Sequence, residues 1–169
     1  DATLTGEFTL DNGFALTLAN GAAGAPLTIS ADAGSTTRFL NAAGTATITW
    51  GSGLTFSGFN SGAGNDGGAV YVGGALTGDI ANSTFEGNTA DVFGGAVHVW
   101  GDLTGGITNS TFTSNRATNG DGGALFVNGD LTGGISGSIC TSNAAGASGG
   151  AVVVGALAGG ITKDRKSVV

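Results

Sequence analysis

Short apolar segments of about six residues alternate along this chain with segments rich in Gly, Asn, Asp and Ser. Within the apolar segments the hydrophobic side chains recur at every second position, which is the period of a strand. No segment shows the 3.6-residue period of a helix, and the intervening residues are typical of turns. The pattern therefore predicts an all-β protein built from many short strands.

The second half of the chain repeats itself. Gly-Gly pairs begin at positions 67, 94, 122 and 149, which gives a nearly constant period. Each pair opens an apolar segment, GGAVYV in the first unit, and a second block such as ALTGDI follows. The first three units add a third block: STFEGN, STFTSN and SICTSN. A period of this length is typical of solenoids, and three strands per unit suit one coil of a parallel β-helix.

Equivalent positions of successive units carry equivalent side chains. In a β-helix these positions lie above one another about 4.8 Å apart, and stacked apolar columns form one continuous core. We predict as core columns Val70, Val97, Leu125 and Val152; Val72, Val99, Val127 and Val154; Leu76, Leu103, Leu131 and Leu157; Ile80, Ile107, Ile135 and Ile161; and Phe85, Phe112 and Cys140.

Asn88, Asn115 and Asn143 form a further column at a predicted corner. Asn tolerates the left-handed backbone of a tight bend, and stacked amides can bond along the axis. Cys140 is the single cysteine of the chain and stands in the Phe column. We therefore interpret it as a small buried hydrophobic residue rather than as a reactive thiol.

Residues 1–66 follow the same scheme less regularly. Phe8, Phe39 and Val70 begin equally spaced apolar runs, at a longer period than that of the Gly-Gly pairs. We therefore predict one domain over residues 1–162, with irregular coils in 1–66 and regular coils in 67–162. About five to six coils would make a rod roughly 25 Å long. Residues 163–169 break the pattern and are either a cap or interaction tail, or not part of the natural chain.

Composition limits the partners. The net charge is −7 with only five Lys and Arg, which argues against nucleic acid and anionic membranes as partners. No apolar run is long enough for a membrane-spanning helix, so we expect no membrane insertion by this segment, and no signal peptide is recognisable.

Two alternating motifs carry a resemblance to a known family. Gly-Gly-Ala-Val or Gly-Gly-Ala-Leu alternates with Phe-x-x-Asn, although Cys140 replaces Phe in the third copy and the fourth copy lacks its partner. Over about residues 38–162 the chain resembles the repeat of polymorphic outer-membrane proteins, a family of autotransporter passengers and adhesin-like surface proteins. The resemblance implies a right-handed parallel β-helix of the pectin-lyase type, exported to the bacterial cell surface. The motif copies are Gly67 to Val70 with Phe85 to Asn88, Gly94 to Val97 with Phe112 to Asn115, Gly122 to Leu125 with Cys140 to Asn143, and Gly149 to Val152 alone.

The outer side of the first strand offers a candidate contact stripe, made of Tyr71, His98, Phe126 and Val153 with Trp100 nearby. A contiguous apolar stripe suggests a surface for sugars or proteins, or lateral packing against another copy, or it is an incidental cross-strand ladder. We expect His98 to be exposed and to be neither a metal ligand nor a general base.

The acidic residues favour no reaction centre. Most stand singly at turns, where Asp usually serves local backbone hydrogen bonds, and a glycosidase would need two facing carboxylates. Asp102 and Asp130 are neighbours in adjacent coils, which leaves a weak cation site as an alternative, and isolated calcium at Asp66 or Asp121 is another. The short column of Thr77, Thr104 and Thr132 is weak support for ice binding. We predict no catalytic, cofactor or metal site.

These observations favour a non-enzymatic extracellular module, structural or adhesin-like, of a bacterial surface protein. Its expected partners are further coils of the same protein, other copies of itself, and a host-surface or glycan ligand. One alternative is a filament subunit that assembles by end-to-end stacking, because open strand edges bind other strands. The other is a polysaccharide-active β-helix enzyme.

Overall fold

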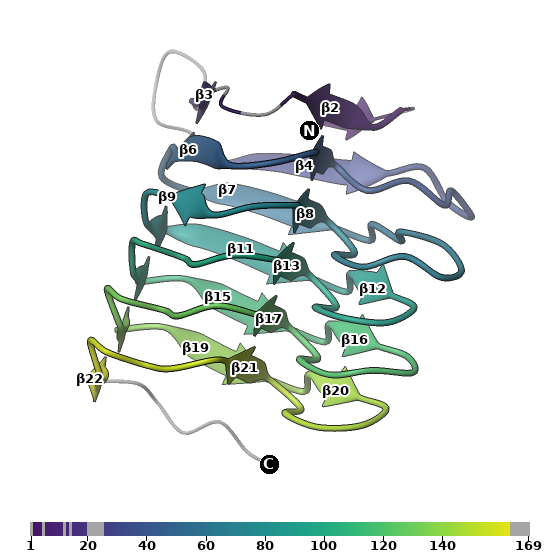
Figure 1. Cartoon of the computed structure of the whole chain (residues 1–169). Coiled ribbons are helices and arrows are strands. Elements are labelled where there is room, and N and C mark those ends of the chain that lie inside the picture. Colours follow the sequence, from purple (N-terminus) through teal and green to yellow (C-terminus); the bar gives the residue numbers. More distant parts are fainter. Residues whose placement is uncertain (1, 5, 12, 14, 20–25, 163–169) are drawn as a thin grey trace.

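The computed structural model describes residues 2–4, 6–11, 13, 15–19 and 26–162. Within them the chain forms strands and turns without a helix, and it winds as a β-solenoid of about five coils (Figure 1). All paired strands are parallel, as predicted. No helix in the described part is long and apolar enough to cross a membrane.

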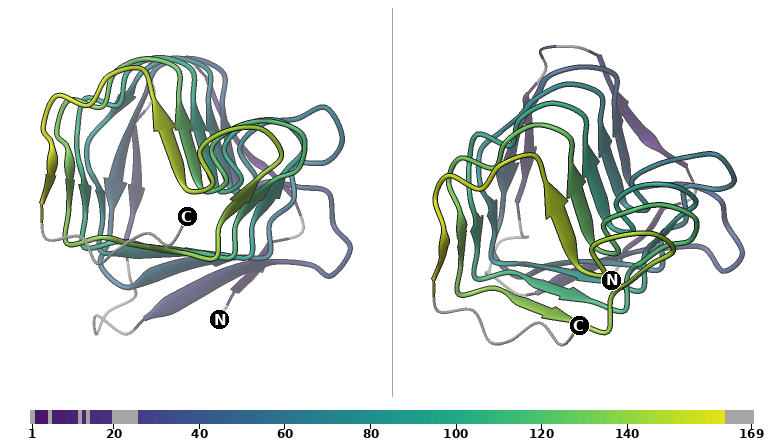
Figure 2. Two further views of the ribbon diagram at one scale, coloured as in Figure 1. Left: turned by 90° about the horizontal axis from the view of Figure 1, so that it is seen from below. Right: turned by 60° about the horizontal axis from the view of Figure 1, so that its bottom comes forward.

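Two long sheets run along the axis on different sides of the solenoid (Figure 2). The valine sheet consists of β2 (Phe8–Leu10), β5 (Leu40–Ala42), β8 (Val70–Val72), β13 (Val97–Val99), β17 (Leu125–Val127) and β21 (Val152–Val154). The phenylalanine sheet consists of β1 (Ala2–Leu4), β4 (Leu27–Ala31), β7 (Leu54–Ser57), β11 (Ser83–Glu86), β15 (Thr111–Thr113) and β19 (Ile139–Thr141).

Three smaller sheets complete the coils. The isoleucine sheet consists of β10 (Ile80–Ala81), β14 (Ile107–Thr108), β18 (Ile135–Ser136) and β22 (Ile161–Thr162). The corner sheet consists of β12 (Thr89–Ala90), β16 (Arg116–Ala117) and β20 (Ala144–Ala145). The N-terminal sheet consists of β3 (Ala15–Leu18), β6 (Ala46–Trp50) and β9 (Leu76–Thr77).

The register confirms the predicted columns. Val97 pairs with Val70 on one side and with Leu125 on the other, and Phe85 pairs with both Phe56 and Phe112. The second predicted strand, however, is divided: the Leu column continues from β9 only as single bridges, while the Ile column forms its own sheet. The corner sheet was not predicted, because its two-residue strands are too short to show alternation.

The core consists of these columns stacked face to face. The rings of Phe56, Phe85 and Phe112 lie 5.0 Å apart between successive centroids and are nearly parallel, and all three are buried. Trp50 contacts this stack edge-on. Offset stacked rings contribute about 0.5–1.5 kcal/mol per pair beyond their buried area.

Burial decreases in the last described coil. Cys140, predicted to be buried, is only partly buried although it packs against the core. Ile161, also predicted in the core, has 61% of its surface exposed. Both stand where the described residues supply no further coil to cover them. A column position therefore predicts burial only when both neighbouring coils are present.

The predicted asparagine column is a hydrogen-bonded ladder. The Asn88 amide donates to Asn115 Oδ1 at 3.0 Å, and the Asn115 amide donates to Asn143 Oδ1 at 3.0 Å. Asn88 and Asn115 are completely buried, and their amides also donate to the backbone carbonyls of Phe56 and Phe85. The ladder thus satisfies polar groups that would otherwise be buried without partners.

The left-handed backbone, however, lies one residue before each asparagine. Gly87, Ser114 and Ser142 have φ values of 62°, 55° and 55°. The prediction that the asparagines themselves adopt this conformation was wrong. The corner therefore requires Asn because its amide both donates and accepts hydrogen bonds, and not because Asn tolerates a positive φ.

We expect Asn115→Ala to lower the free energy of unfolding by about 3 kcal/mol, because the substitution leaves buried groups of the ladder unpaired. Equilibrium denaturation followed by circular dichroism measures the change. Asn119→Ala is the matched control, since Asn119 is exposed and should change stability by about 0.5 kcal/mol or less. Equal losses in the two variants would contradict a stabilising role for the ladder.

Candidate functional site

The predicted contact stripe lies on the outer face of the valine sheet. His98 pairs in register with Tyr71 in β8 and with Phe126 in β17, which in turn pairs with Val153 in β21. Tyr71, Phe126 and Val153 are partly buried. Trp100, which follows β13, has 55% of its surface exposed. The structure therefore brings the predicted residues together on one face.

His98 is the exception, because its exposed fraction is 0%. Four aromatic rings surround the imidazole with centroids 5.4–5.9 Å away: Tyr71, Phe93, Trp100 and Phe126. All four meet it at steep interplanar angles between 60° and 68°. The prediction of an exposed His98 was wrong, because strand alternation shows which face a side chain takes but not what covers that face.

Phe93 is the covering residue that the sequence argument missed. It stands directly before Gly94, where the other units have Asp66, Asp121 and Ser148 before their Gly-Gly pairs. From this turn its ring stacks on Phe126, with centroids 4.7 Å apart, and contacts His98. The sequence does contain a signal for this contact. An aromatic residue at a position that is otherwise occupied by turn-forming residues indicates that its ring packs on a nearby apolar surface.

Polar groups lie near both nitrogens of the buried imidazole. His98 Nε2 lies 2.7 Å from Asn128 Oδ1, so a proton on Nε2 is donated to this acceptor. Nδ1 lies 3.2 Å from Asp66 Oδ2, which is an ion-pair distance without the direction of a hydrogen bond. Asp66 Oδ1 accepts the backbone N–H of Phe93 at 3.1 Å. One carboxylate thus approaches the imidazole and also accepts a hydrogen bond from the turn that covers it.

These contacts set the ionisation of Asp66. Burial alone would raise the pKa of its carboxyl. The contact and charge of His98, the N–H of Phe93 and the charge of Arg38 lower this pKa by more than burial raises it. The net effect is an Asp66 pKa below its ordinary value. The carboxylate therefore stays ionised inside the cluster at neutral pH.

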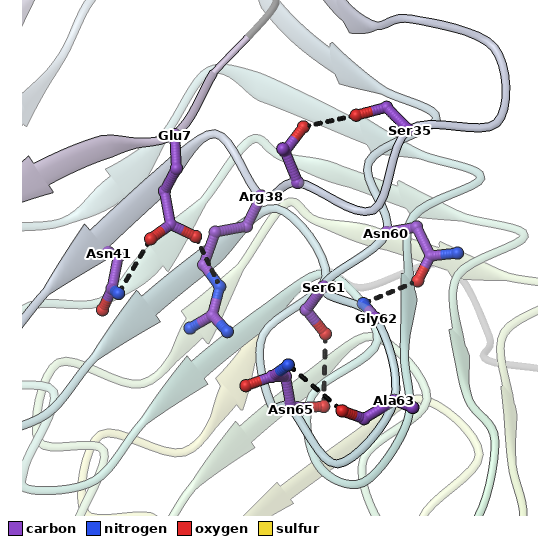
Figure 3. A network of polar contacts seen from close by, with 10 residues as sticks. Glu7, Ser35, Arg38, Asn41, Asn60, Ser61, Gly62, Ala63 and Asn65 are labelled. Atoms are coloured by element: carbon purple, nitrogen blue, oxygen red, sulfur yellow. Dashed lines mark hydrogen bonds and ion pairs between the residues drawn. The ribbon is translucent and has the colours of Figure 1, made fainter.

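Arg38 extends the polar contacts toward the first coil (Figure 3). Its Nε lies 3.1 Å from Glu7 Oε2, and Glu7 Oε1 accepts a hydrogen bond from Asn41 at 2.9 Å. The guanidinium lies 5.2 Å from the centre of the Tyr71 ring. Burial lowers the pKa of Arg38, and the charges of Glu7, Asp66 and Tyr71 only partly oppose this. Arg38 thus links the first two coils to the aromatic face.

The turn aspartates bond between coils rather than within their own turns. Asp102 Oδ1 accepts the backbone N–H of Asp130 at 2.9 Å. In the same way, Asp79 Oδ1 accepts the backbone N–H of Gly106 at 2.7 Å, and Asp121 Oδ1 accepts the backbone N–H of Ser148 at 2.6 Å. The expectation of local hydrogen bonds was wrong, since each of these contacts joins equivalent turns of successive coils.

In the described coils the predicted acids and threonines take part in contacts between coils. Among the residues that the structure describes, no three or more His, Cys, Asp or Glu side chains lie close enough to hold a metal ion. In the threonine column, Thr132 Oγ1 donates to the Thr104 carbonyl at 2.7 Å, and Thr104 Oγ1 reaches the Leu76 carbonyl at 3.5 Å. Two of the three column hydroxyls are therefore directed to the backbone.

Comparison with known proteins supports the resemblance. Residues 82–99 and 109–128 match the model of the Chlamydia polymorphic membrane protein repeat. Each segment contains one Phe-x-x-Asn motif and one Gly-Gly-Ala motif, so the match falls on the residues that suggested it. His98 lies in the first segment and Asn128 in the second, whereas Trp100 lies between them. Searches of curated proteins and of solved structures found no match.

We expect the stability of the fold to decrease on acidification partly through Asp66. Its pKa is lower in the folded than in the unfolded chain, so the ionised carboxylate stabilises the fold at pH values above its unfolded pKa of about 4. This contribution disappears as the pH falls through the lower folded-state pKa. Denaturant titrations between neutral and acidic pH should show a weaker acid dependence for Asp66→Asn than for the wild type.

Asp32→Asn is the control for this experiment, since Asp32 is an exposed turn residue. We expect it to keep the pH dependence of the wild type. If Asp66→Asn and Asp32→Asn gave the same profile as the wild type, the Asp66–His98 contact would not couple ionisation to folding.

Proposed function

We propose that this chain is a non-enzymatic, adhesin-like module of a bacterial surface protein, which presents side chains on a stiff extracellular solenoid. The observation that carries this proposal is the match of two segments, from successive coils, to the polymorphic membrane protein repeat, on a fold whose coils pair with one another. The interior is filled by aliphatic and aromatic columns, so the interactions of the module take place on its outer faces.

The arrangement of titratable groups supports a role without catalysis. His98 is buried, and Asp66, Asp79, Asp102 and Asp121 each accept a backbone N–H of a neighbouring coil. A general acid or base must reach its substrate within hydrogen-bond distance. These groups instead stabilise the stack, which favours the module over the polysaccharide-active enzyme.

Labelling of intact cells tests the proposed location. We expect antibodies raised against the purified chain to label unpermeabilised cells of the bacterium that produces it. Beads coated with the folded chain should attach to epithelial cells, while beads coated with the chemically unfolded chain should not. Labelling that appears only after permeabilisation, or equal attachment of both bead types, would contradict the proposal.

A second candidate function is self-assembly into a filament. In the last described coil, β21 and β22 pair on one side only within the described chain, and Ile139 and Ile161 are exposed. Strand edges and apolar side chains of this kind can accept another coil.

Light scattering and electron microscopy of the purified chain test assembly. A filament predicts growth of the scattering mass with concentration and fibres with an axial repeat of roughly 25–30 Å. Ile161→Lys should shorten or abolish such fibres, whereas Thr132→Lys, on an exposed side position, should leave them unchanged. A monomer at all concentrations would exclude the filament and leave the adhesin-like module as the remaining proposal.

A further inference from the structure

Trp100 occupies an unusual position in the repeat. It directly follows Val99, and the pairing of Val72, Val99, Val127 and Val154 makes Gly73, Asn128 and Gly155 its counterparts in the other coils. At the position equivalent to Trp100, one adjacent coil therefore has Gly73, which carries no side chain, and the other has the amide of Asn128. We call Trp100 and Asn128, both exposed, the Trp100–Asn128 shelf.

The shelf rests on a buried support. The Trp100 ring contacts the His98 imidazole at 5.9 Å and 60°, and the Trp100 backbone N–H donates to the Val72 carbonyl at 2.9 Å. His98 is itself held between Asn128 and Asp66. An exposed aromatic ring on a fixed support loses little conformational entropy when a ligand covers it. This arrangement is that of a binding platform rather than of a loose surface side chain.

The polar groups of the shelf have a defined direction. Asn128 Oδ1 is hydrogen-bonded to His98 Nε2. This bond fixes the orientation of the amide, whose Nδ2 group carries two N–H donors on the side away from Oδ1. Two residues beyond each shelf position lie the exposed Asp102 and Asp130. Their carboxylates supply acceptors, although Asp102 Oδ1 already accepts the Asp130 N–H. The shelf and the residues two positions beyond it thus supply an amide donor and acidic acceptors.

This combination fits a neutral sugar. A pyranose ring has an apolar face of polarised C–H groups, which is attracted to the negative face of an aromatic ring, and a rim of hydroxyls that both donate and accept hydrogen bonds. The carboxylates and the net charge of −7 disfavour acidic sugars. We propose that the Trp100–Asn128 shelf binds a neutral hexopyranose unit of a glycan. This inference rests on the proposed function of the chain as a surface module.

A cationic peptide is the main competing occupant. A Lys or Arg side chain could lie over the indole beside the acidic residues. Such a ligand would not use the amide donors of Asn128, and a single flat ring is a weaker cation site than several rings enclosing one charge. The oriented amide therefore favours the sugar.

Neoglycoproteins carrying glucose, galactose or mannose test the proposal, with sialylated neoglycoproteins and polylysine as comparison probes. We expect the wild type to bind at least one neutral probe more strongly than the sialylated one. Trp100→Ala should weaken this binding at least tenfold, and Asn128→Ala should weaken it severalfold. Thr132→Ala, an exposed substitution outside the shelf, should leave it unchanged.

Indole fluorescence gives a second measurement on the unmodified chain. Trp50 is buried and Trp100 is exposed, so acrylamide should quench mainly Trp100. The bound neutral probe should protect this fluorescence from quenching, and Trp100→Phe should remove the quenchable component while retaining part of the binding. This measurement decides the question even if Trp100→Ala does not fold.

Three results would overturn the inference: no binding of any neutral probe, equal binding by Trp100→Ala, or binding of polylysine that depends on Trp100 without binding of neutral sugars. None of them bears on surface labelling of intact cells. If Trp100→Ala beads still attached to epithelial cells, the adhesin-like function would stand while the shelf would not be its glycan site. Loss of both labelling and attachment in the wild type would instead contradict the proposed function.

Discussion

Parallel pairing between coils is the interaction on which every other feature of this protein depends. A single coil has only short strands and cannot cover its own apolar side chains. Stacking places Phe85 between Phe56 and Phe112, and it gives the strand backbones their hydrogen-bond partners. Each coil therefore depends on its neighbours for its core, and its strand edges pair with those of the next coil.

Side chains reinforce the same contact at the corners and turns. The amides of Asn88, Asn115 and Asn143 bond along the axis inside the corner, while Asp79 and Asp102 bond to backbone N–H groups of the next coil outside it. Both sets act between residues far apart in sequence and close in space. The stability of the fold is thus approximately a sum of the interactions between neighbouring coils, which suits a stiff rod.

The chemically distinctive surface arises where the repeat is broken. Phe93 replaces a turn residue and covers His98, and Trp100 replaces a glycine and remains exposed above it. Asp66 and Asn128, from the two neighbouring coils, hold the imidazole between these rings. Regular positions build the scaffold, and the irregular ones create the candidate recognition face.

The sequence by itself determined the coil period, the parallel register and the inward columns, because identical side chains at a constant spacing have one consistent way to stack. It also identified Tyr71, His98, Trp100 and Phe126 as neighbours. Only the tertiary structure decided that His98 is buried, that the aspartates bond across coils, and that Ile161 is exposed. Those properties depend on how turns fold over a face and on which coils are present, and strand periodicity carries no information about either.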